Sequence, residues 1–190
     1  MLLPTQRAGA PHRHLLTLVG KEGVIYLLDR DNLGKFNPTN DDQIVQSLPT
    51  AVMPTGGVAA WWNNTIYFIP VGDYLKAFHF DPKTRFLSLA PVSQSTTFFD
   101  FPTALISVSS NGNKDGIVWA PQNDGYDRGQ SAILRAFDAH NLARELYNSQ
   151  ENFARDDAGP AGKFTVPTIV NGKVYFTTHK RLVVYGLLPE

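Results

Sequence analysis

Apolar and polar residues alternate in short runs near the C-terminus, in the stretch FTVPTIVNGKVYFTTHKRLVVYGLL at residues 164–188. Asn171 and Gly172 separate two runs that are rich in β-branched and aromatic residues, and both tolerate the positive φ that a two-residue hairpin turn requires. The polar triplet HKR at residues 179–181 turns the chain into a third apolar run, LVVYGLL. The pattern predicts three short antiparallel strands, with Pro167 near the start of the first, where a missing N–H is tolerated.

The same order of strands and turns occurs three more times, in residues 14–36, 56–86 and 101–147. When the third strands are aligned, VIYLLD, YLKAFH, ILRAFD and RLVVYG stand above one another, and their last residues are separated by 50, 59 and 48 positions. Helical periodicity is nearly absent, because the best helical candidate, residues 139–154, fits better as a fourth strand around ARELY. Repeats of about 50 residues with three or four short strands are typical of β-propeller blades.

The sequence therefore predicts an all-β protein with a single domain of propeller-type repeats. It would hold about four four-stranded antiparallel blades, at approximately residues 1–50, 51–98, 99–160 and 161–190. Only MLLP, at residues 1–4, could supply the opening strand of the first unit, so we expect an incomplete propeller, the C-terminal part of a larger ring. An array that does not close leaves a sheet face and a strand edge without neighbours, and we therefore expect self-association through the open ends.

The composition of the 190 residues limits the choice of partners. Lys plus Arg and Asp plus Glu number 17 each, so no net charge favours nucleic acid or an anionic membrane surface. Cysteine is absent, which excludes disulfides, thiolate metal sites and a Cys nucleophile. The opening residues MLLPTQRAGAPHRH lack the pattern of a signal peptide, and no apolar stretch approaches the ~18 residues of a membrane span. We expect neither a nucleic-acid nor a membrane partner.

Three segments resemble the repeats of pyrroloquinoline-quinone (PQQ)-like propellers, the quinoprotein alcohol dehydrogenase-like family: NGKVYFTTHKRLVVYG, GKEGVIYLLDRDNLGKF and AILRAFDAHNLARELY. In that family an Asp after the third strand and a Trp in the fourth strand dock neighbouring blades. Asp29 and Asp138 match the Asp position, whereas His79 and Gly186 depart from it. Three aromatic residues stand about where the docking Trp falls: Phe36, Phe86 and Tyr147. The resemblance implies that an aromatic ring still fills that position.

A more specific likeness, carried by GKEGVIYLLDRDNLG and by residues 162–188, is to the C-terminal part of secreted bacterial PQQ-like propellers. It implies a fragment of a longer chain and an extracytoplasmic location, periplasmic or secreted. A PQQ- and calcium-dependent dehydrogenase is the enzymatic alternative, but the adjacent-cysteine disulfide and the CxxCH haem motif of such enzymes are missing. We assign no catalytic, cofactor-binding or metal-ligating residue and predict no cofactor, with PQQ and calcium as the alternative.

Two polar motifs have both a structural and a chemical interpretation. DRDNLG, at residues 29–34, has the acids and the Gly of a calcium loop, but Leu33 and Asn40 stand where oxygen ligands belong. A polar turn with an Asx hydrogen bond is therefore favoured. NDGYDRG, at residues 123–129, is favoured as a solvated loop over an ion or ligand site.

His12 and His14, one residue apart, could share a metal ion, but the sequence nominates no third ligand. Trp61 and Trp62 point to opposite faces if they lie in a strand. Packing in the core or between blades is favoured for both rings, and the alternative is an exposed stacking platform for a sugar or an aromatic ligand.

The sequence thus favours a non-catalytic binding or interaction scaffold, whose ligand is a protein, a small molecule or a carbohydrate. The alternatives are a fragment of a PQQ-dependent dehydrogenase and a sugar-binding propeller.

Overall fold

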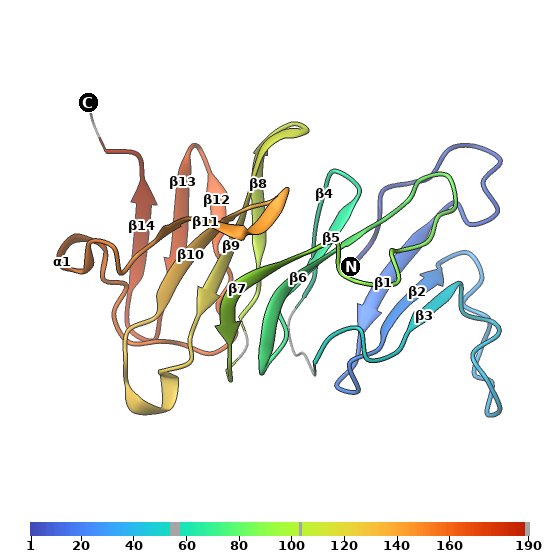
Figure 1. Ribbon diagram of the computed structural model, residues 1–190, viewed down its shortest axis with the longest axis horizontal. Helices are drawn as coiled ribbons and strands as arrows, with labels where there is room; N and C mark the ends of the chain where they lie inside the picture. Colours follow the sequence, from blue (N-terminus) through green and yellow to red (C-terminus); the bar gives the residue numbers. More distant parts are fainter. Residues whose placement is uncertain (54–57, 103, 189–190) are drawn as a thin grey trace.

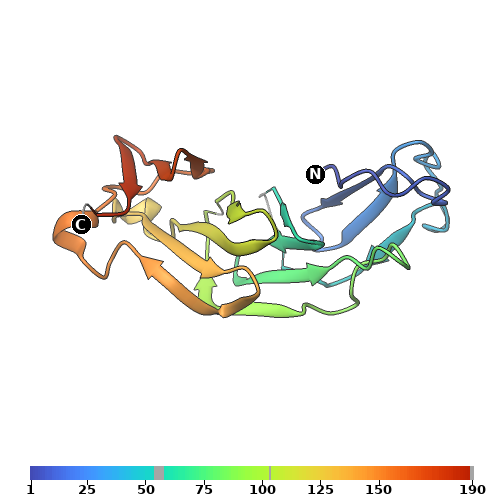
Figure 2. The same ribbon diagram turned by 90° about the horizontal axis from the view of Figure 1, so that it is seen from above.

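The computed structural model describes residues 1–53, 58–102 and 104–188, and this part of the chain is built mainly from short β-strands. The strands form four separate antiparallel sheets, each made from consecutive segments of the chain. The sheets stand side by side (Figure 1), and seen from above they form a row that curves without closing (Figure 2). The predicted all-β, partial-propeller fold is confirmed. The first two residues of the predicted unit 56–86 lie outside the described residues.

The first and last sheets contain three named strands each. The first sheet consists of β1 Leu15–Val19, β2 Ile25–Asp29 and β3 Gln46–Leu48. The last sheet consists of β12 Thr168–Val170, β13 Lys173–Thr177 and β14 Leu182–Gly186. The N-terminal residues add a short stretch beside β1, because Leu2 forms a β-bridge with Leu16 and the N–H of Leu3 donates to the carbonyl of Leu15 at 3.0 Å. MLLP, the only stretch that could supply the opening strand, therefore forms a single β-bridge there and no named strand.

The two middle sheets contain four strands each. The second consists of β4 Ala60–Trp62, β5 Thr65–Phe68, β6 Asp73–His79 and β7 Ser93–Phe99. The third consists of β8 Ser107–Asn111, β9 Lys114–Gln122, β10 Ile133–Asp138 and β11 Asn141–Asn148. Two short helices, η1 Tyr126–Arg128 and α1 Phe153–Asp156, accompany the third sheet. The strand predicted around ARELY is β11, and the four aligned third strands are β2, β6, β10 and β14.

The hairpin turns have the backbone geometry that the sequence predicts. Asn171 and Gly172, between β12 and β13, have φ of 50° and 69°. Asn63 and Asn64, between β4 and β5, have φ of 44° and 57°. Two consecutive residues at positive φ match the right-handed twist of the flanking strands and fix the register of each hairpin. Pro167 directly precedes β12, in agreement with the prediction.

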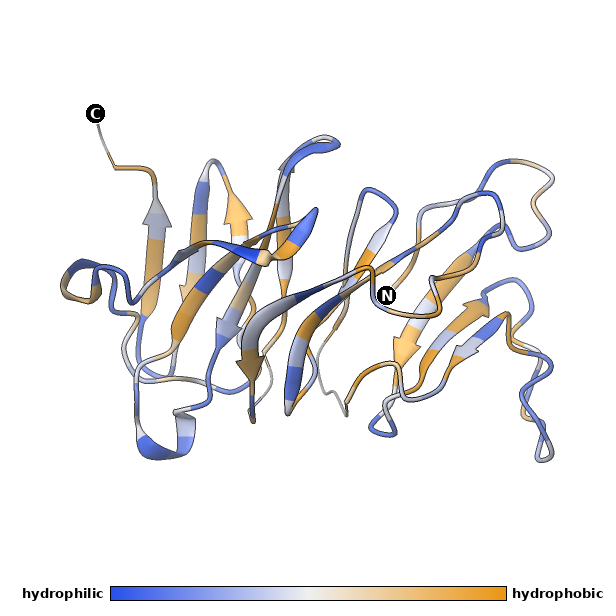
Figure 3. Cartoon of the chain, in the orientation of Figure 1, coloured by the Kyte–Doolittle hydropathy of each residue, from blue (hydrophilic) through white to orange (hydrophobic). Residues whose placement is uncertain are grey.

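The core lies between the sheets, in three clusters of buried apolar residues that each join two neighbouring sheets. The second sheet is covered on both faces: Ile66 and Phe68 belong to the cluster with the first sheet, and Tyr67 and Ile69 to the cluster with the third. A strand buried on both faces reads as a continuous apolar run, which explains the sequence IYFI. Figure 3 shows how apolar residues concentrate on the strands.

Neighbouring sheets stack in the same order of strands. The first strands of the second, third and fourth sheets lie next to one another, with β4 against β8 and β8 against β12. The outermost strand β11 of the third sheet lies against β7, the outermost strand of the second. The contacts between the second, third and fourth sheets thus follow the order of strands that propeller blades have.

The prediction that aromatic residues dock neighbouring sheets is wrong for two of the three residues. Phe36 is 88% exposed and Phe86 is 45% exposed, so neither ring fills a buried slot between sheets. The reason is register: the outermost strands begin only at Gln46 and Ser93, after longer loops than the repeat suggests. The matching acids do not dock neighbouring sheets either. Asp29 and Asp138 hydrogen-bond within their own units, for example to the N–H of Asp31 and of His140, respectively.

Candidate interaction site

The last sheet exposes one complete face. In the pairing register, Thr168, Tyr175 and Val184 stand side by side, and the neighbouring residues of each strand point the other way. The side chains that point inward, among them Val174 and Phe176, are buried against the third sheet. The outward face carries three apolar side chains that are about half exposed or more: Val170 at 47%, Leu182 at 62% and Val184 at 47%. We call it the outer face of the fourth sheet.

The first sheet has an outward face of the same kind at the other end of the row. Leu16 pairs with Leu28, Leu18 pairs with Tyr26, and Leu2 bridges to Leu16, so these apolar side chains gather on the face opposite the buried Leu15 and Leu27. Leu2 is 61% exposed and Leu18 is 43% exposed. Within the described part of the chain nothing covers either outward face. Apolar sheet faces of this kind are the surfaces by which propeller blades and interaction partners stack.

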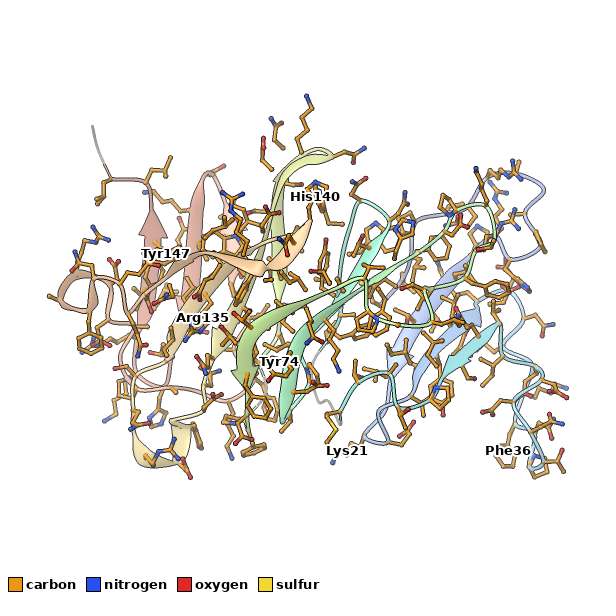
Figure 4. The ribbon with its side chains drawn as sticks, in the orientation of Figure 1. Lys21, Phe36, Tyr74, Arg135, His140 and Tyr147 are labelled. Carbon is orange, nitrogen blue, oxygen red and sulfur yellow. The ribbon has the colours of Figure 1, made fainter. Side chains whose placement is uncertain are left out.

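A groove of about 510 Å³ lies between the third and fourth sheets, and its lining on the fourth sheet includes Gly172, Val174 of β13 and residues of β14. Its β14 wall is formed by four consecutive residues, 183–186. Its opposite wall carries Trp119 of β9 and Tyr147 of β11, and the exposed Leu187 and Leu188 line one side. Figure 4 labels Tyr147, whose ring lies 6.3 Å from that of Tyr185 of β14, edge to face. The groove is therefore mainly apolar, with its aromatic rings already held in place.

A polar cluster at Asp156 lies along this groove. The carboxylate of Asp156 accepts hydrogen bonds from the hydroxyl of Tyr147 at 2.9 Å and from the guanidinium of Arg155 at 2.7 Å. The hydroxyl of Tyr185 donates to the backbone carbonyl of Asp156 at 2.9 Å. The short helix α1 places Arg155 and Asp156 there, on the segment that follows β11. These bonds tie the third sheet and its following segment to β14.

The electrostatics of this cluster fit a structural role. The guanidinium of Arg155 holds the pKa of Asp156 below its ordinary value, with a further hydrogen bond from Tyr147. Burial raises the pKa of Tyr147 and raises that of Tyr185 to about 12, so both phenols stay protonated as donors. Because each group is engaged with another, the cluster offers no free base or nucleophile, and its chemistry is to fix the walls of the groove.

The two predicted Trp residues are both packed between sheets. The ring of Trp61 meets Phe80 edge to face at 5.8 Å on the side of the first sheet. Trp62 is 7% exposed on the side of the third sheet and donates its indole N–H to the carbonyl of Gly112 at 2.8 Å. They point to opposite faces, as predicted, and the favoured packing role is confirmed. The burial of Trp62 rules out an exposed stacking platform for that ring, whereas Trp61 is only partly buried, so the platform alternative stays a prediction for Trp61.

The structure separates the two histidines. His12 pairs through Nδ1 with Asp29 at 2.8 Å, and His14 pairs with Asp31 at 2.7 Å. In DRDNLG, the N–H of Asp31 donates to Asp29 and the N–H of Gly34 donates to Asn32, which confirms the Asx-bonded turn. Among the described residues no three His, Asp or Glu side chains are grouped to hold a metal ion.

The loop at residues 123–129 is an ordered turn. It contains η1, and the amide of Asn123 is buried and donates to the hydroxyl of Thr165 at 3.2 Å. A second depression, of about 430 Å³, is lined by the turn at residues 113–117 and by Asp138, His140 and Arg144. Two acids line this depression, and one of them, Asp138, accepts hydrogen bonds from Arg144 at 3.3 Å and from the N–H of His140 at 2.8 Å.

Sequence patterns contain little indication of the groove. The repeat predicts Tyr147 only as a docking aromatic, and its ring does contact the next sheet. Arg155 and Asp156 lie in a polar segment that reads as an ordinary loop. The available signal is the last repeat itself, because LVVYG aligns with the third strand of each other unit and no fourth strand follows it within the described residues.

Comparison with known proteins agrees with the fold. No protein-family model matches the chain, and no curated protein matches it by sequence. Nine chains of known structure match, among them "The crystal structure of BamB from Moraxella catarrhalis", with 14% sequence identity and a TM-score of 0.54. The match covers 90% of this chain and 42% of the BamB chain, so this chain spans less than half the length of that structure. The likeness shows a PQQ-like propeller fold. No described helix has the length and hydropathy of a membrane span.

Proposed function

We propose that this chain is a protein-interaction scaffold built on a partial β-propeller, without a catalytic role of its own. The observation that carries the proposal is the pair of apolar outward faces at the two ends of the row. Leu18 on the first sheet and Leu182 on the fourth are 43% and 62% exposed, on sheets whose other faces are packed. Exposed apolar sheet faces are characteristic of surfaces that bind proteins.

Three further parts of the proposal rest on the resemblance to PQQ-like propellers and on the repeat. The four sheets correspond to four blades, with boundaries near residues 50, 98 and 160. The location is extracytoplasmic. Nucleic acid and membranes are not partners, because the charges balance at 17 of each sign.

Site-specific photo-crosslinking tests the scaffold proposal. A benzophenone amino acid is placed at Val170 or at Leu18, one on each outward face, and at the exposed Lys83 as a control. In cells that produce the protein, we expect adducts from the two faces and none from position 83, and the captured protein should bind the purified chain. Equal labelling from all three positions, or no adduct from either face, would contradict the proposal.

A separate measurement addresses the enzymatic alternative. The purified chain is mixed with PQQ and Ca²⁺, and quinone absorption and dye reduction with alcohols or sugars are followed. We expect no change in the quinone spectrum and no dye reduction. A bound quinone spectrum with substrate-dependent dye reduction would replace the scaffold proposal with an oxidoreductase.

A further inference from the structure

Three connections between strands meet at one end of the second, third and fourth sheets. They run from β7 to β8, from β9 to β10 and from α1 to β12, and they lie at the lower end of these sheets in Figure 1. The N–H of Asp100 donates to the carboxylate of Asp124 at 3.1 Å, which joins the first connection to the second. The N–H of Leu105 donates to the carbonyl of Thr165 at 3.0 Å, which joins the first to the third. The three connections therefore form one ordered surface.

Lys163 lies in this surface with its ammonium group against two aromatic rings. Its Nζ lies 4.6 Å from the centroid of the Tyr126 ring and 5.2 Å from that of the Phe101 ring. An ammonium ion over the face of an aromatic ring is attracted by the quadrupole of the ring within about 6 Å. Each of these three residues belongs to a different connection. The rings thus hold a cation in place on a side chain that is otherwise flexible.

The ammonium group of Lys163 forms no ion pair with a carboxylate of the described residues. The acids of the three connections have other partners. Asp100 accepts a backbone N–H at 2.7 Å, Asp124 accepts a glutamine amide at 2.6 Å, and Asp127 and Asp157 pair with arginine guanidinium groups at 3.4 and 3.5 Å. Because Lys163 is exposed, a carboxylate of another molecule can reach its ammonium group.

Apolar side chains of the same connections are open to solvent. Phe101 is 55% exposed, Phe164 is 54% exposed and Val166 is 43% exposed. Phe164 has a φ of 55°, in a region that bulky residues rarely enter, and it stands with Lys163 between two buried residues. A backbone held in a sparsely populated region thus presents a cation and an aromatic ring to solvent. Aromatic residues are enriched in the same way at protein–protein interfaces.

We propose that a partner protein docks on this surface and pairs an Asp or Glu side chain, flanked by apolar residues, with Lys163. This inference rests on the proposed scaffold function and names the contact surface and the chemistry of the partner. The carboxylate follows from charge complementarity with an ammonium group that has no internal acid. The apolar flanks follow from the exposed rings of Phe101 and Phe164. Phosphate sites typically use several N–H donors or a guanidinium fork, whereas this surface offers one ammonium group among rings.

The test selects random peptides displayed on phage against the purified chain. The key variant is Lys163→Glu, which reverses the charge of an exposed side chain, and Lys163→Arg keeps a cation that can stack on the same rings. Lys83→Glu is the matched control, because it makes the same charge reversal at an exposed Lys in the connection from β6 to β7. Phe101→Leu removes one of the two rings. Circular dichroism verifies that each variant is folded.

We expect a group of selected peptides that share an Asp or Glu flanked by apolar residues and that shift the ring resonances of Phe101 and Tyr126. Their affinity should fall at least tenfold in Lys163→Glu, and equally when their acid is replaced by the amide. It should fall about threefold in Phe101→Leu and stay within threefold in Lys163→Arg and Lys83→Glu.

The absence of such peptides, or equal affinity for the wild type and Lys163→Glu, would overturn the inference. Retention on heparin that Lys163→Glu abolishes would reveal a polyanion site and would overturn it as well. If no acidic peptide is selected while the protein captured at Val170 or Leu18 binds the wild type and Lys163→Glu equally, the scaffold proposal stands and this inference fails.

Discussion

Replacing Tyr67 by Phe tests the contact between the second and third sheets with a single atom. The side chain of Tyr67 is fully buried, and its hydroxyl donates to the carbonyl of Ala139, in the turn after β10, at 2.9 Å. The bond joins residues that are 72 positions apart, on two different sheets. Burial raises the pKa of Tyr67 to about 12, so the hydroxyl remains a donor at neutral pH.

The expected cost of Tyr67→Phe follows from what the change leaves behind. The ring and its packing are kept, but one buried hydrogen bond is lost and a buried carbonyl loses its partner, which costs roughly 1–3 kcal/mol. We expect the free energy of unfolding to fall by about 1–2 kcal/mol. In a chain of this size each kcal/mol lowers Tm by roughly 2–4 °C.

Urea unfolding followed by Trp fluorescence measures this loss. Tyr175→Phe is the matched control, because Tyr175 lies on the outer face of the fourth sheet and its hydroxyl makes no hydrogen bond to another described residue. We expect the control to stay within about 0.5 kcal/mol of the wild type, as is usual for surface changes. If Tyr67→Phe is as stable as the control, the second and third sheets do not meet as described.

Three other outcomes are expected. Phe176→Ala should lower the free energy of unfolding by about 3–5 kcal/mol in the same assay, because Phe176 is fully buried between the third and fourth sheets, whereas Phe153→Ala, at a 54% exposed site, should cost far less. The lowered pKa of Asp156 means that its carboxylate stabilises the fold fully above about pH 4 and that this contribution is lost as pH falls through the lowered pKa. Asp156→Asn should therefore flatten the loss of Tm between pH 4 and pH 2, and an unchanged slope would speak against the ion pair. Light scattering of the concentrated chain should show association that Leu18→Lys weakens, and a monodisperse monomer would refute association through the open ends.

Much of the fold is readable from the sequence because each repeat carries its own local signals. Asn63-Asn64 and Asn171-Gly172 specify turns through their tolerance of positive φ, and a one-residue slip of register would move every apolar side chain to the wrong face. The prediction of the four third strands is confirmed for the same reason, because apolar residues alternate along each of them with the two-residue period of a β-strand. The opposite orientations of Trp61 and Trp62 are predicted by the alternation of side chains along a strand.

The starts of the outermost strands and the position of the groove cannot be predicted from local sequence patterns. Phe36 and Phe86 fail as docking residues because the loops before β3 and β7 set where those strands begin, and loop length has no periodic signal. The cluster around Asp156 brings together Tyr147 and Tyr185, which are 38 positions apart, through the packing of two sheets. A contact of this kind depends on the tertiary arrangement, and local pattern does not encode it.

Nuclear Overhauser contacts between aromatic rings test the stacked row of sheets most directly. The rings of Phe99 and Phe137, on the second and third sheets, lie 6.4 Å apart, and those of Tyr147 and Tyr185, on the third and fourth, lie 6.3 Å apart. Phe68 and Phe78, within the second sheet, are 6.0 Å apart and serve as the internal reference. We predict cross-peaks for all three pairs. A spectrum with the Phe68–Phe78 contact but neither of the other two would contradict the stacking on which the scaffold and its groove depend.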